Sequence, residues 1–316
     1  MRVLVLNEHE VEELLTMPEC IAVMEDALAA LARGEFQNPL RQAFRPAGAA
    51  GLLGLMPAYR AGSRPLFGLK EVCVFPGNPA RGLDTHLGAV LLHDGETGEL
   101  LAMMSASAIT AIRTAAVSAV ATKLLARPDA RRLAILGGGV QARSHLKAIP
   151  LIRDIEEIRL HRWSAAIPGG AVRCSSAEEA VAGADIIVTA TSSREPVLIR
   201  DWIAPGAHIN AVGSSIASAR ELDAATVAAA SLFVDRREST VNESGDYLFA
   251  LREGAIDESH IRAEIGEILV GRATGRRSRE EITLFKSLGL AAEDLASAQF
   301  LYEKANREGR GTWVGV

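Results

Sequence analysis

The segment LAILGGGVQARSHL, residues 133–146, constrains the fold of this chain more than any other. Four apolar residues typical of a buried strand end in three consecutive glycines, and a helical pattern begins near Val140. Gly137, Gly139 and Ala142 fit the spacing G-x-G-x-x-A. The first glycine permits a tight turn, the second lets a pyrophosphate approach the backbone, and the small alanine lets the helix pack on the strand. The free N–H groups at the helix N-terminus favour phosphate, so the segment predicts a dinucleotide site.

Strands and helices alternate along the chain after this segment. Strand-like runs occupy residues 157–162, 171–174, 185–191, 208–213 and 231–235, and helical patterns occupy 176–184 and 221–230. This alternation predicts an α/β fold with a Rossmann-type doubly wound parallel sheet. It also favours a dinucleotide site over the alternative, a glycine-rich turn with no ligand.

One connection in this predicted sheet is unusually short. Only the eight residues WSAAIPGG, 163–170, separate the second strand from the third. A parallel crossover generally needs a dozen residues or more and usually a helix. Either the crossover helix is missing or the order of the sheet is altered at this point.

The two ends of the chain predict a second domain of α+β type. The N-terminal part contains a strand at 2–6, a helix from about 17 to 34, short strands between 36 and 92, a hairpin turn at 94–98 and a helix at 105–126. The tail from about residue 281 is predicted to be one long helix that packs back on these segments. We therefore expect residues 1–118 and 290–316 to form one domain and residues 119–289 to form the Rossmann domain.

Composition excludes several other classes of function. The net charge of −5 over 316 residues provides no basic field for nucleic acid. Cys20, Cys73 and Cys174 are far apart, and neither they nor the histidines have a spacing typical of a metal site. The N-terminal apolar run is too short for a signal peptide, and no window approaches the roughly 20 uncharged apolar residues of a membrane span. We expect a cytoplasmic protein with no metal and no membrane partner.

The end of the second predicted strand, HRWS at 161–164, bears on the choice of cofactor. In Rossmann folds an acidic residue here holds the ribose 2′-OH of NADH, whereas an arginine accommodates the 2′-phosphate of NADPH. This chain has no carboxylate at that place. Arg162 and Ser164 therefore favour NADPH over NADH, with a solvated arginine as the alternative.

Several long segments resemble the ornithine cyclodeaminase/mu-crystallin family over nearly the whole chain. They are GLMPAY (54–59), VFPGNPARGLDTH (74–86), ITAIRTAAVSA (109–119), LGGGVQARSH (136–145), EAVAGADIIVTATSSREPVL (179–198), PGAHINAVGSS (205–215), ARELD (219–223) and TLFKSLGLAAEDL (283–295). The resemblance implies a homodimer, a Rossmann domain for NAD(P), and a substrate-binding and dimerisation domain formed by both chain ends. It also implies hydride transfer at the α-carbon of a small α-amino or α-imino acid.

Such chemistry requires a carboxylate clamp and a proton donor. Arg113 lies on a helix of small residues, where a charge is costly unless it is paired. It forms either a bidentate grip on a substrate carboxylate or a buried ion pair with a protein carboxylate. The resemblance places Arg41 and Lys70 at substrate-carboxylate and catalytic positions, with Arg45 as the alternative to Arg41. The strand neighbours of Lys70 should shield it from water and lower its pKa towards a useful acid/base range.

The resemblance places further residues on each side of the predicted site. Near the cofactor it places Thr114, Val140, Gln141, Ser287 and Leu288, in addition to the glycine loop. On the substrate side the candidates are Met56, His86 and Ser215, and His86 has a structural role as an equal alternative.

Two departures from the cyclodeaminase pattern decide between activities. The family's cyclodeaminases carry a carboxylate after the fifth strand and a glutamate before the Met-Pro pair, and this chain has Ser215 and Gly54 at those places. Losing a general base typically costs about 10²–10⁴ in rate. We therefore expect NAD(P)H-dependent reduction of a small cyclic or N-substituted α-imino acid. The alternatives are ornithine cyclodeamination, an alanine-dehydrogenase-like activity, or a catalytically weak crystallin-like protein that binds NADP.

Overall fold

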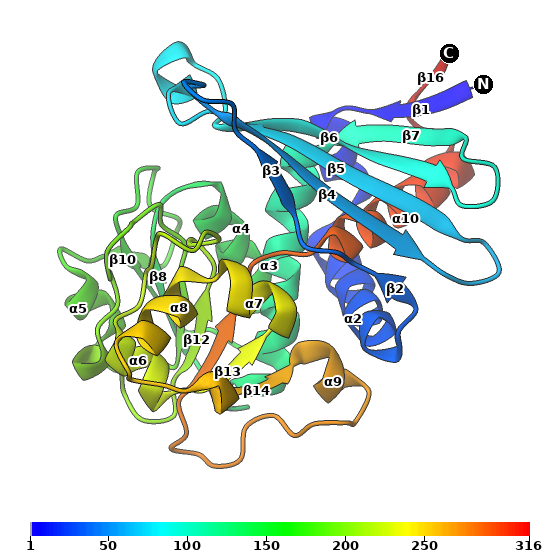
Figure 1. Cartoon of the computed structure of the whole chain (residues 1–316). Helices are drawn as coiled ribbons and strands as arrows, with labels where there is room; N and C mark the ends of the chain where they lie inside the picture. Colours follow the sequence, from blue (N-terminus) through cyan, green and yellow to red (C-terminus); the bar gives the residue numbers. More distant parts are fainter. Residues whose placement is uncertain (1) are drawn as a thin grey trace. The chain divides into compact units, whose positions relative to one another are not determined.

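A computed structural model describes residues 2–316 and divides the chain into two compact units (Figure 1). Of the described residues, 2–113 and 290–316 form the first unit, and 114–289 form the second. Met1, the first residue of the expected domain range 1–118, lies outside the described residues. The expected boundary at 118/119 and the boundary at 113/114 both fall within helix α3, Ala106–Leu125.

A mostly antiparallel sheet is the base of the first unit. Its strand order is β16-β1-β7-β6-β5-β4-β2, with β3 paired to β4, and β1 runs parallel to β7. The strands are β1 Arg2–Leu6, β2 Phe36–Gln37, β3 Gln42–Phe44, β4 Leu52–Arg60, β5 Leu66–Val74, β6 His86–Asp94, β7 Leu100–Ser105 and β16 Thr312–Gly315. A 3₁₀ turn, η1 Asn78–Arg81, lies between β5 and β6.

Helices α1, Glu8–Leu14, α2, Met17–Arg33, and α10, Ala291–Glu308, complete this unit. Helix α2 begins with a capping box, because the Glu19 carboxylate accepts hydrogen bonds from the Thr16 backbone N–H and hydroxyl. It ends at Gly34, whose φ of 83° is the left-handed conformation typical of a C-terminal cap. Helix α10 packs against α2 and against β4 to β7.

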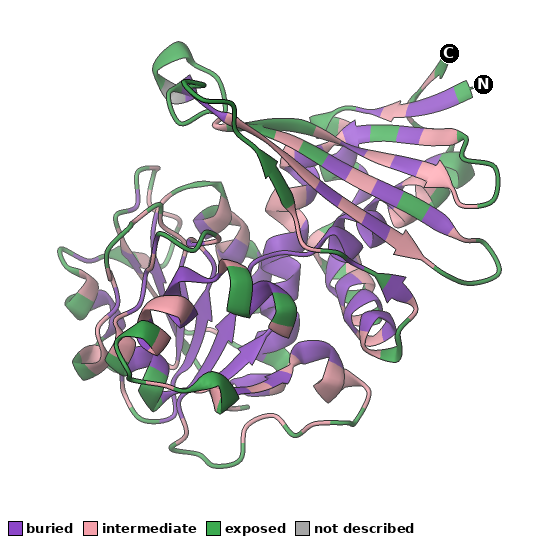
Figure 2. Ribbon diagram, viewed as in Figure 1, coloured by how far each residue is buried: buried purple, intermediate pink, exposed green. Residues whose placement is uncertain are grey.

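The second unit has an eight-stranded sheet whose strands all pair in parallel. The order is β10-β9-β8-β11-β12-β15-β13-β14, which confirms the predicted doubly wound α/β fold. The strands are β8 Arg132–Leu136, β9 Glu157–His161, β10 Ala171–Arg173, β11 Ile186–Thr189, β12 His208–Ala211, β13 Ser231–Val234, β14 Ile261–Glu264 and β15 Thr283–Lys286. Strands β11, β12 and β15, in the middle of this order, are buried along their whole length (Figure 2).

Helices and short turns connect these strands. They are α4 Val140–Ala148, η2 Ile149–Leu151, α5 Ala177–Val181, η3 Arg200–Trp202, α6 Ala224–Ala229, α7 Arg237–Glu243, α8 Gly245–Arg252, η4 Glu258–His260 and α9 Ile265–Leu269.

The short connection from β9 to β10 proves to lack a crossover helix. The two strands are parallel neighbours, with Ala171 opposite Ile158, so the order of the sheet is not altered. The loop is organised around Trp163, which is 3% exposed and donates its indole N–H to the Ala166 carbonyl. A buried indole thus supplies the packing that a helix would otherwise provide.

The prediction of one long helix from residue 281 is wrong. Thr283–Lys286 form strand β15, which lies between β12 and β13, and helix α10 begins only at Ala291. All four strand residues are buried. A short run that is buried on both faces has no alternating pattern, so periodicity alone does not distinguish it from a buried helix.

By length and composition, α3 is the one helix among the described residues that could cross a membrane, although it carries Arg113 and Lys123. Of its most apolar stretch, 72% is buried inside the protein. That burial is typical of a core helix.

Helix α10 approaches β5 so closely that glycine is required at position 68. A Cβ on Gly68 would lie 2.9 Å from Cβ of Leu295. We expect Gly68→Ala to push α10 off the sheet and to lower the free energy of unfolding by about 1–3 kcal/mol, as overpacking does. Urea unfolding measures this. Gly77→Ala is the matched control, because no atom lies within 4 Å of where its Cβ would be. Equal stabilities of the two variants would contradict the packing argument.

Candidate functional site

The glycine loop after β8 is shaped by close contacts with neighbouring strand ends. Gly137 has a φ of 131°, and a Cβ there would lie 2.3 Å from the Ala190 carbonyl oxygen. A Cβ on Gly138 would lie 2.5 Å from the Arg162 carbonyl oxygen. Gly139 differs, because among the described residues, its own chain neighbours aside, no atom lies within 4 Å of where its Cβ would be. The protein's own packing therefore explains the first two glycines and leaves space beside the third.

That space adjoins the N-terminus of α4. Gly139 is the N-cap in extended conformation and provides no capping side chain, and Val140 is 52% exposed. The N-terminus of α4 is therefore not capped by the side chain of its own N-cap residue, and a helix N-terminus favours an anion. Ala142 is fully buried against the sheet core, which is the helix–strand packing expected from the motif. These features fit a dinucleotide pyrophosphate.

His145 fixes the first turn of α4. It is fully buried, and burial lowers its pKa to about 4, so the ring is neutral. Its Nδ1 lies 2.7 Å from the Gln141 carbonyl oxygen, which only accepts, so Nδ1 carries the proton. Its Nε2 then accepts from the Ser118 hydroxyl at 2.8 Å. The backbone of Gln141 is held against α3 in this way.

The loop after β9 contacts the glycine loop directly. The Ser164 hydroxyl donates to the Gly138 carbonyl at 3.2 Å, and Arg143 Nη1 donates to the same oxygen at 3.0 Å. Arg162 is exposed and has a φ of 58°, the one positive φ among the described non-glycine residues. Tertiary contacts must hold this uncommon conformation, and such residues cluster at ligand sites. Arg162 and Ser164 thus lie beside the predicted phosphate loop.

The turn after β15 supplies a second set of groups at the same edge of the sheet. The Leu288 and Gly289 N–H groups donate to the Asp235 carboxylate at 2.6 and 2.8 Å. Ser287 is 2% exposed, and its Oγ has no hydrogen-bond partner among the described residues. A buried hydroxyl without a partner is unusual, and in open α/β sheets ligands bind at the carboxyl ends of strands. Thr114, on α3, is also buried, with 6% exposed.

A buried carboxylate that sequence reasoning missed ties these strand ends together. Glu221 is fully buried and accepts hydrogen bonds from the Thr189 hydroxyl, from the N–H and hydroxyl of Thr191, and from the Gly213 N–H. Asp246 accepts from the Glu221 N–H and lies 2.9 Å from Lys286 Nζ. Three strand ends, those of β11, β12 and β15, are thereby joined. Nothing in ARELD indicated which carboxylate would be buried, because three of its five residues are charged.

In the first unit, Lys70 occupies the buried face of β5. It is 6% exposed, and its Nζ donates to the Thr110 hydroxyl at 2.7 Å. Its Nζ also lies 3.6 Å from Asp294 Oδ1. Burial lowers the pKa of Lys70 to about 8, and the positive charges of Arg113 and Arg41 act in the same direction, against the negative charge of Asp294. An amine with this pKa can exchange a proton near neutral pH.

Arg113 forms the buried ion pair that was the alternative to a substrate clamp. It is 4% exposed, with Nη1 2.8 Å from Glu293 Oε2 and Nε 3.1 Å from Asp294 Oδ1. Sequence reasoning missed both carboxylates. The signal was two adjacent acids within the Ala-rich stretch GLAAEDLASA, where burial requires cationic partners. The pairing fixes the orientation of the guanidinium.

The remaining substrate-side candidates differ in their proximity to Lys70. Met56 is buried on β4 and is the direct cross-strand partner of Lys70. Arg41, before β3, is close enough to influence the pKa of Lys70, whereas Arg45 is exposed beyond β3. His86 begins β6. Its pKa is lowered mainly by partial burial and further by the positive charge of Lys70. Met56, Arg41 and His86 thus adjoin Lys70 within the first unit. Ser215 belongs to the second unit and is half-buried after β12.

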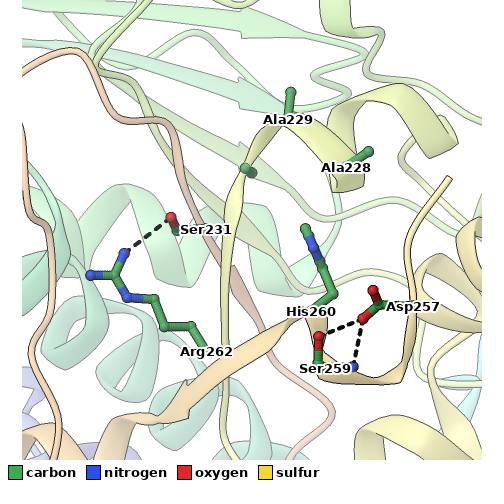
Figure 3. A pocket seen from close by; sticks show the side chains of 8 residues that line it. Ala228, Ala229, Ser231, Asp257, Ser259, His260 and Arg262 are labelled. Atoms are coloured by element: carbon green, nitrogen blue, oxygen red, sulfur yellow. Dashed lines mark hydrogen bonds between the residues drawn. The ribbon is translucent and has the colours of Figure 1, made fainter.

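A pocket of the second unit is lined by residues other than those of the glycine loop and the Ser287 turn (Figure 3). It is lined by Ala228–Ser231, Asp257, Ser259, His260 and Arg262, at the amino ends of β13 and β14. Within it Ser259 donates to Asp257, and Arg262 donates to the Ser231 hydroxyl at 3.1 Å. Because cofactors bind at the opposite, carboxyl ends of such strands, we do not assign this pocket to the dinucleotide.

Comparisons with known proteins agree with this geometry. The model of the ornithine cyclodeaminase/mu-crystallin family matches residues 1–309. Ketimine reductase mu-crystallin of Mus musculus is 40% identical over 310 residues, which cover 94% of this chain and 96% of that protein. Thermococcus litoralis Δ1-pyrroline-2-carboxylate reductase, solved in complex with NADH and L-proline, has a TM-score of 0.92 at 41% identity and covers 98% and 99% of the two chains. An archaeal alanine dehydrogenase dimer with bound NAD has a TM-score of 0.91 at 34% identity, with 100% and 99% covered.

The open space at Gly139 can be tested without disturbing the fold. We expect Gly139→Val to raise the Kd for NADH at least about tenfold, equivalent to about 1.4 kcal/mol, because the side chain would occupy the space left for the pyrophosphate. Fluorescence titration measures the Kd, and thermal unfolding should be nearly unchanged. Gly169→Val is the control, since its Cβ position is equally open but lies in the loop before β10. Unchanged affinity in Gly139→Val would remove Gly139 from the site.

Proposed function

Because the chain belongs to the ornithine cyclodeaminase/mu-crystallin family, we propose that it reduces a small cyclic α-imino acid, of the pyrroline-2-carboxylate or piperideine-2-carboxylate type, to the amino acid. The predicted family, the Rossmann fold and the NAD(P)-dependent oxidoreductase class are confirmed by these relatives. The observation that carries the substrate proposal is the buried Lys70, whose pKa of about 8 suits a proton donor near neutral pH.

The reaction requires a hydride, one proton, and a cationic group that binds the substrate carboxylate. Bound NAD(P)H would supply the hydride for the imine carbon. The electron pair of the C=N bond moves to nitrogen, which takes a proton from the Lys70 ammonium. Arg41 and Arg113 bind the substrate carboxylate in this proposal. Arg113 would do so while it stays ion-paired with Glu293 and Asp294, so the two roles that the sequence offered as alternatives are combined.

Cyclodeamination is disfavoured by the residues at positions 54 and 215. Gly54 is part of β4, and a Cβ there would lie 3.3 Å from Val72 Cγ1, so the strand leaves little room for a longer side chain. Ser215 is neutral and cannot replace a carboxylate as a general base unaided. The archaeal alanine dehydrogenase keeps amino-acid dehydrogenation as the second candidate activity. Imine reduction needs no carboxylate at either place.

NADPH is the proposed cofactor, although solved relatives contain NADH or NAD. Arg162 is exposed beside the glycine loop, and the end of β9 carries no carboxylate to hold a ribose 2′-OH. A guanidinium is a strong partner for phosphate. Arg162 and Ser164 are the proposed ligands of the 2′-phosphate.

A second copy of the chain is the proposed partner of the outer face of the first unit's sheet. Phe67 is 48% exposed and Met103 is 42% exposed, on the face opposite to α10. Tyr59 packs on Phe67 with ring centroids 4.7 Å apart. Exposed apolar faces of this kind typically mark interfaces, and the archaeal alanine dehydrogenase is a dimer. We also propose a cytoplasmic location, consistent with three free cysteines.

The substrate proposal predicts a specific pattern of activity. Purified protein should oxidise NAD(P)H with pyrroline-2-carboxylate or piperideine-2-carboxylate and should release little ammonia from ornithine. The absorbance of the reduced nicotinamide measures NAD(P)H oxidation, and an ammonia assay measures release from ornithine. Ammonia release at comparable efficiency would establish a cyclodeaminase instead. Inactivity with the imino acids, with ornithine and with alanine would favour a protein that binds NADP without turnover.

The role of Lys70 is tested in the same assay. Lys70→Ala should lower kcat for the imino acid by about 10²–10⁴, because it removes the proton donor, while the Kd for NADPH stays within about twofold. A large loss of cofactor binding would show that Lys70 has another role.

The cofactor proposal predicts a change of preference on mutation. Arg162→Ala should lower kcat/KM for NADPH at least about tenfold, since it removes a charged phosphate ligand worth at least about 1.4 kcal/mol. Steady-state kinetics should show little change with NADH, which has no 2′-phosphate and is the internal control. An equal loss of kcat/KM with both cofactors would mean that Arg162 stabilises the loop and does not bind the 2′-phosphate.

A further inference from the structure

The inner face of the first unit holds four buried charged side chains in one cluster. Lys70 comes from β5, Arg113 from α3, and Glu293 and Asp294 from the first turn of α10. Each is at most 6% exposed. The two cations and two carboxylates balance in charge, as buried ions must.

The two carboxylates have different partners. Glu293 Oε2 lies 2.8 Å from Arg113 Nη1. Asp294 Oδ1 lies 3.1 Å from Arg113 Nε and 3.6 Å from Lys70 Nζ, so it is shared between the two cations. Its second oxygen is buried without a hydrogen-bond partner among the described residues. Asp294 is thus the carboxylate of the cluster that faces the amine.

We propose that Asp294 is a positioning residue that keeps the proton on Lys70, so that Lys70 remains an ammonium while Arg113 is engaged by a substrate carboxylate. The inference rests on the proposed function, in which Lys70 donates the proton to the imine nitrogen. After that transfer the neutral amine regains a proton from solvent.

Apart from Glu293, the other groups around Lys70 oppose its charge or are neutral. Burial and the positive charges of Arg113 and Arg41 disfavour the ammonium, and the Thr110 hydroxyl accepts one of its hydrogen bonds. Glu293 favours the ammonium less than Asp294 does. The charged or titratable groups that face Lys70 are Asp294 and Glu293 on α10, Arg113 on α3, His86 on β6, and Arg41 before β3.

This arrangement predicts a pH profile and its change on mutation. A proton donor acts below its pKa, so kcat/KM for the imino acid should fall as pH rises through about 8, the pKa of Lys70. Asp294→Asn removes the charge and keeps an oxygen that can accept from Arg113 Nε. The descending limb should then move to lower pH by about 1–3 pH units, the usual effect of an opposite charge at this distance. Activity should recover on further acidification.

Two variants separate a charge effect from a structural one. Glu293→Gln removes the neighbouring buried carboxylate. The descending limb of its pH profile should move to lower pH by less than half the shift seen in Asp294→Asn. Asp294→Glu keeps the charge, and its limb should stay near that of the wild type. A uniform loss of activity at every pH, with the limb in place, would mean that Asp294 only supports the fold. If Asp294→Asn does not fold by circular dichroism, Asp294→Ser is measured in its place with the same two outcomes.

Failure of this inference is distinguishable from failure of the proposed function. If Lys70→Ala retains turnover, Lys70 is not the donor and the proposed mechanism is wrong. If Lys70→Ala is inactive but Asp294→Asn and Glu293→Gln have the wild-type limb, only the role of Asp294 is overturned.

Discussion

The carboxylate of Asp294 lies between two buried cations, 3.1 Å from Arg113 Nε and 3.6 Å from Lys70 Nζ. Removing any one of these charges would leave another buried without compensation, which costs several kcal/mol. The pairing therefore fixes where α10 meets β5 and α3, and Gly68 allows the close approach that it needs. A helix from the C-terminal end of the chain completes a site that begins on an N-terminal strand.

Glu221 has the corresponding role in the second unit. Its carboxylate joins the ends of β11 and β12, and the adjoining pair of Asp246 and Lys286 adds the end of β15. The glycine loop, the Arg162 loop and the Ser287 turn all lie at the carboxyl edge of the same sheet. Buried ionic groups thus support the edges of both units on which the proposed chemistry relies, while the residues expected to contact ligands are few.

The sequence predicted much of this organisation. The G-x-G-x-x-A spacing and the alternation of strands and helices identified the parallel sheet, because local propensities and the fold agree there. Lys70 was singled out through the family resemblance, and the expected lowering of its pKa agrees with its burial. The strand at Thr283–Lys286 was mistaken for helix, since a run buried on both faces carries no periodicity. Glu293 and Asp294 were missed because their partners are more than 170 residues away in sequence.

The sequence by itself determined the fold class, the family and the glycine loop that is predicted to bind phosphate, because these depend on residue types at short, fixed spacings. It also determined the absence of carboxylates at Gly54 and Ser215, which favours imine reduction over cyclodeamination. Only the tertiary structure decided that Arg113 is paired with two protein carboxylates, that β9 and β10 are neighbours without a crossover helix, and that Lys70 shares a carboxylate with Arg113. Such contacts join distant segments, and the low dielectric in which they act exists only once the chain has folded.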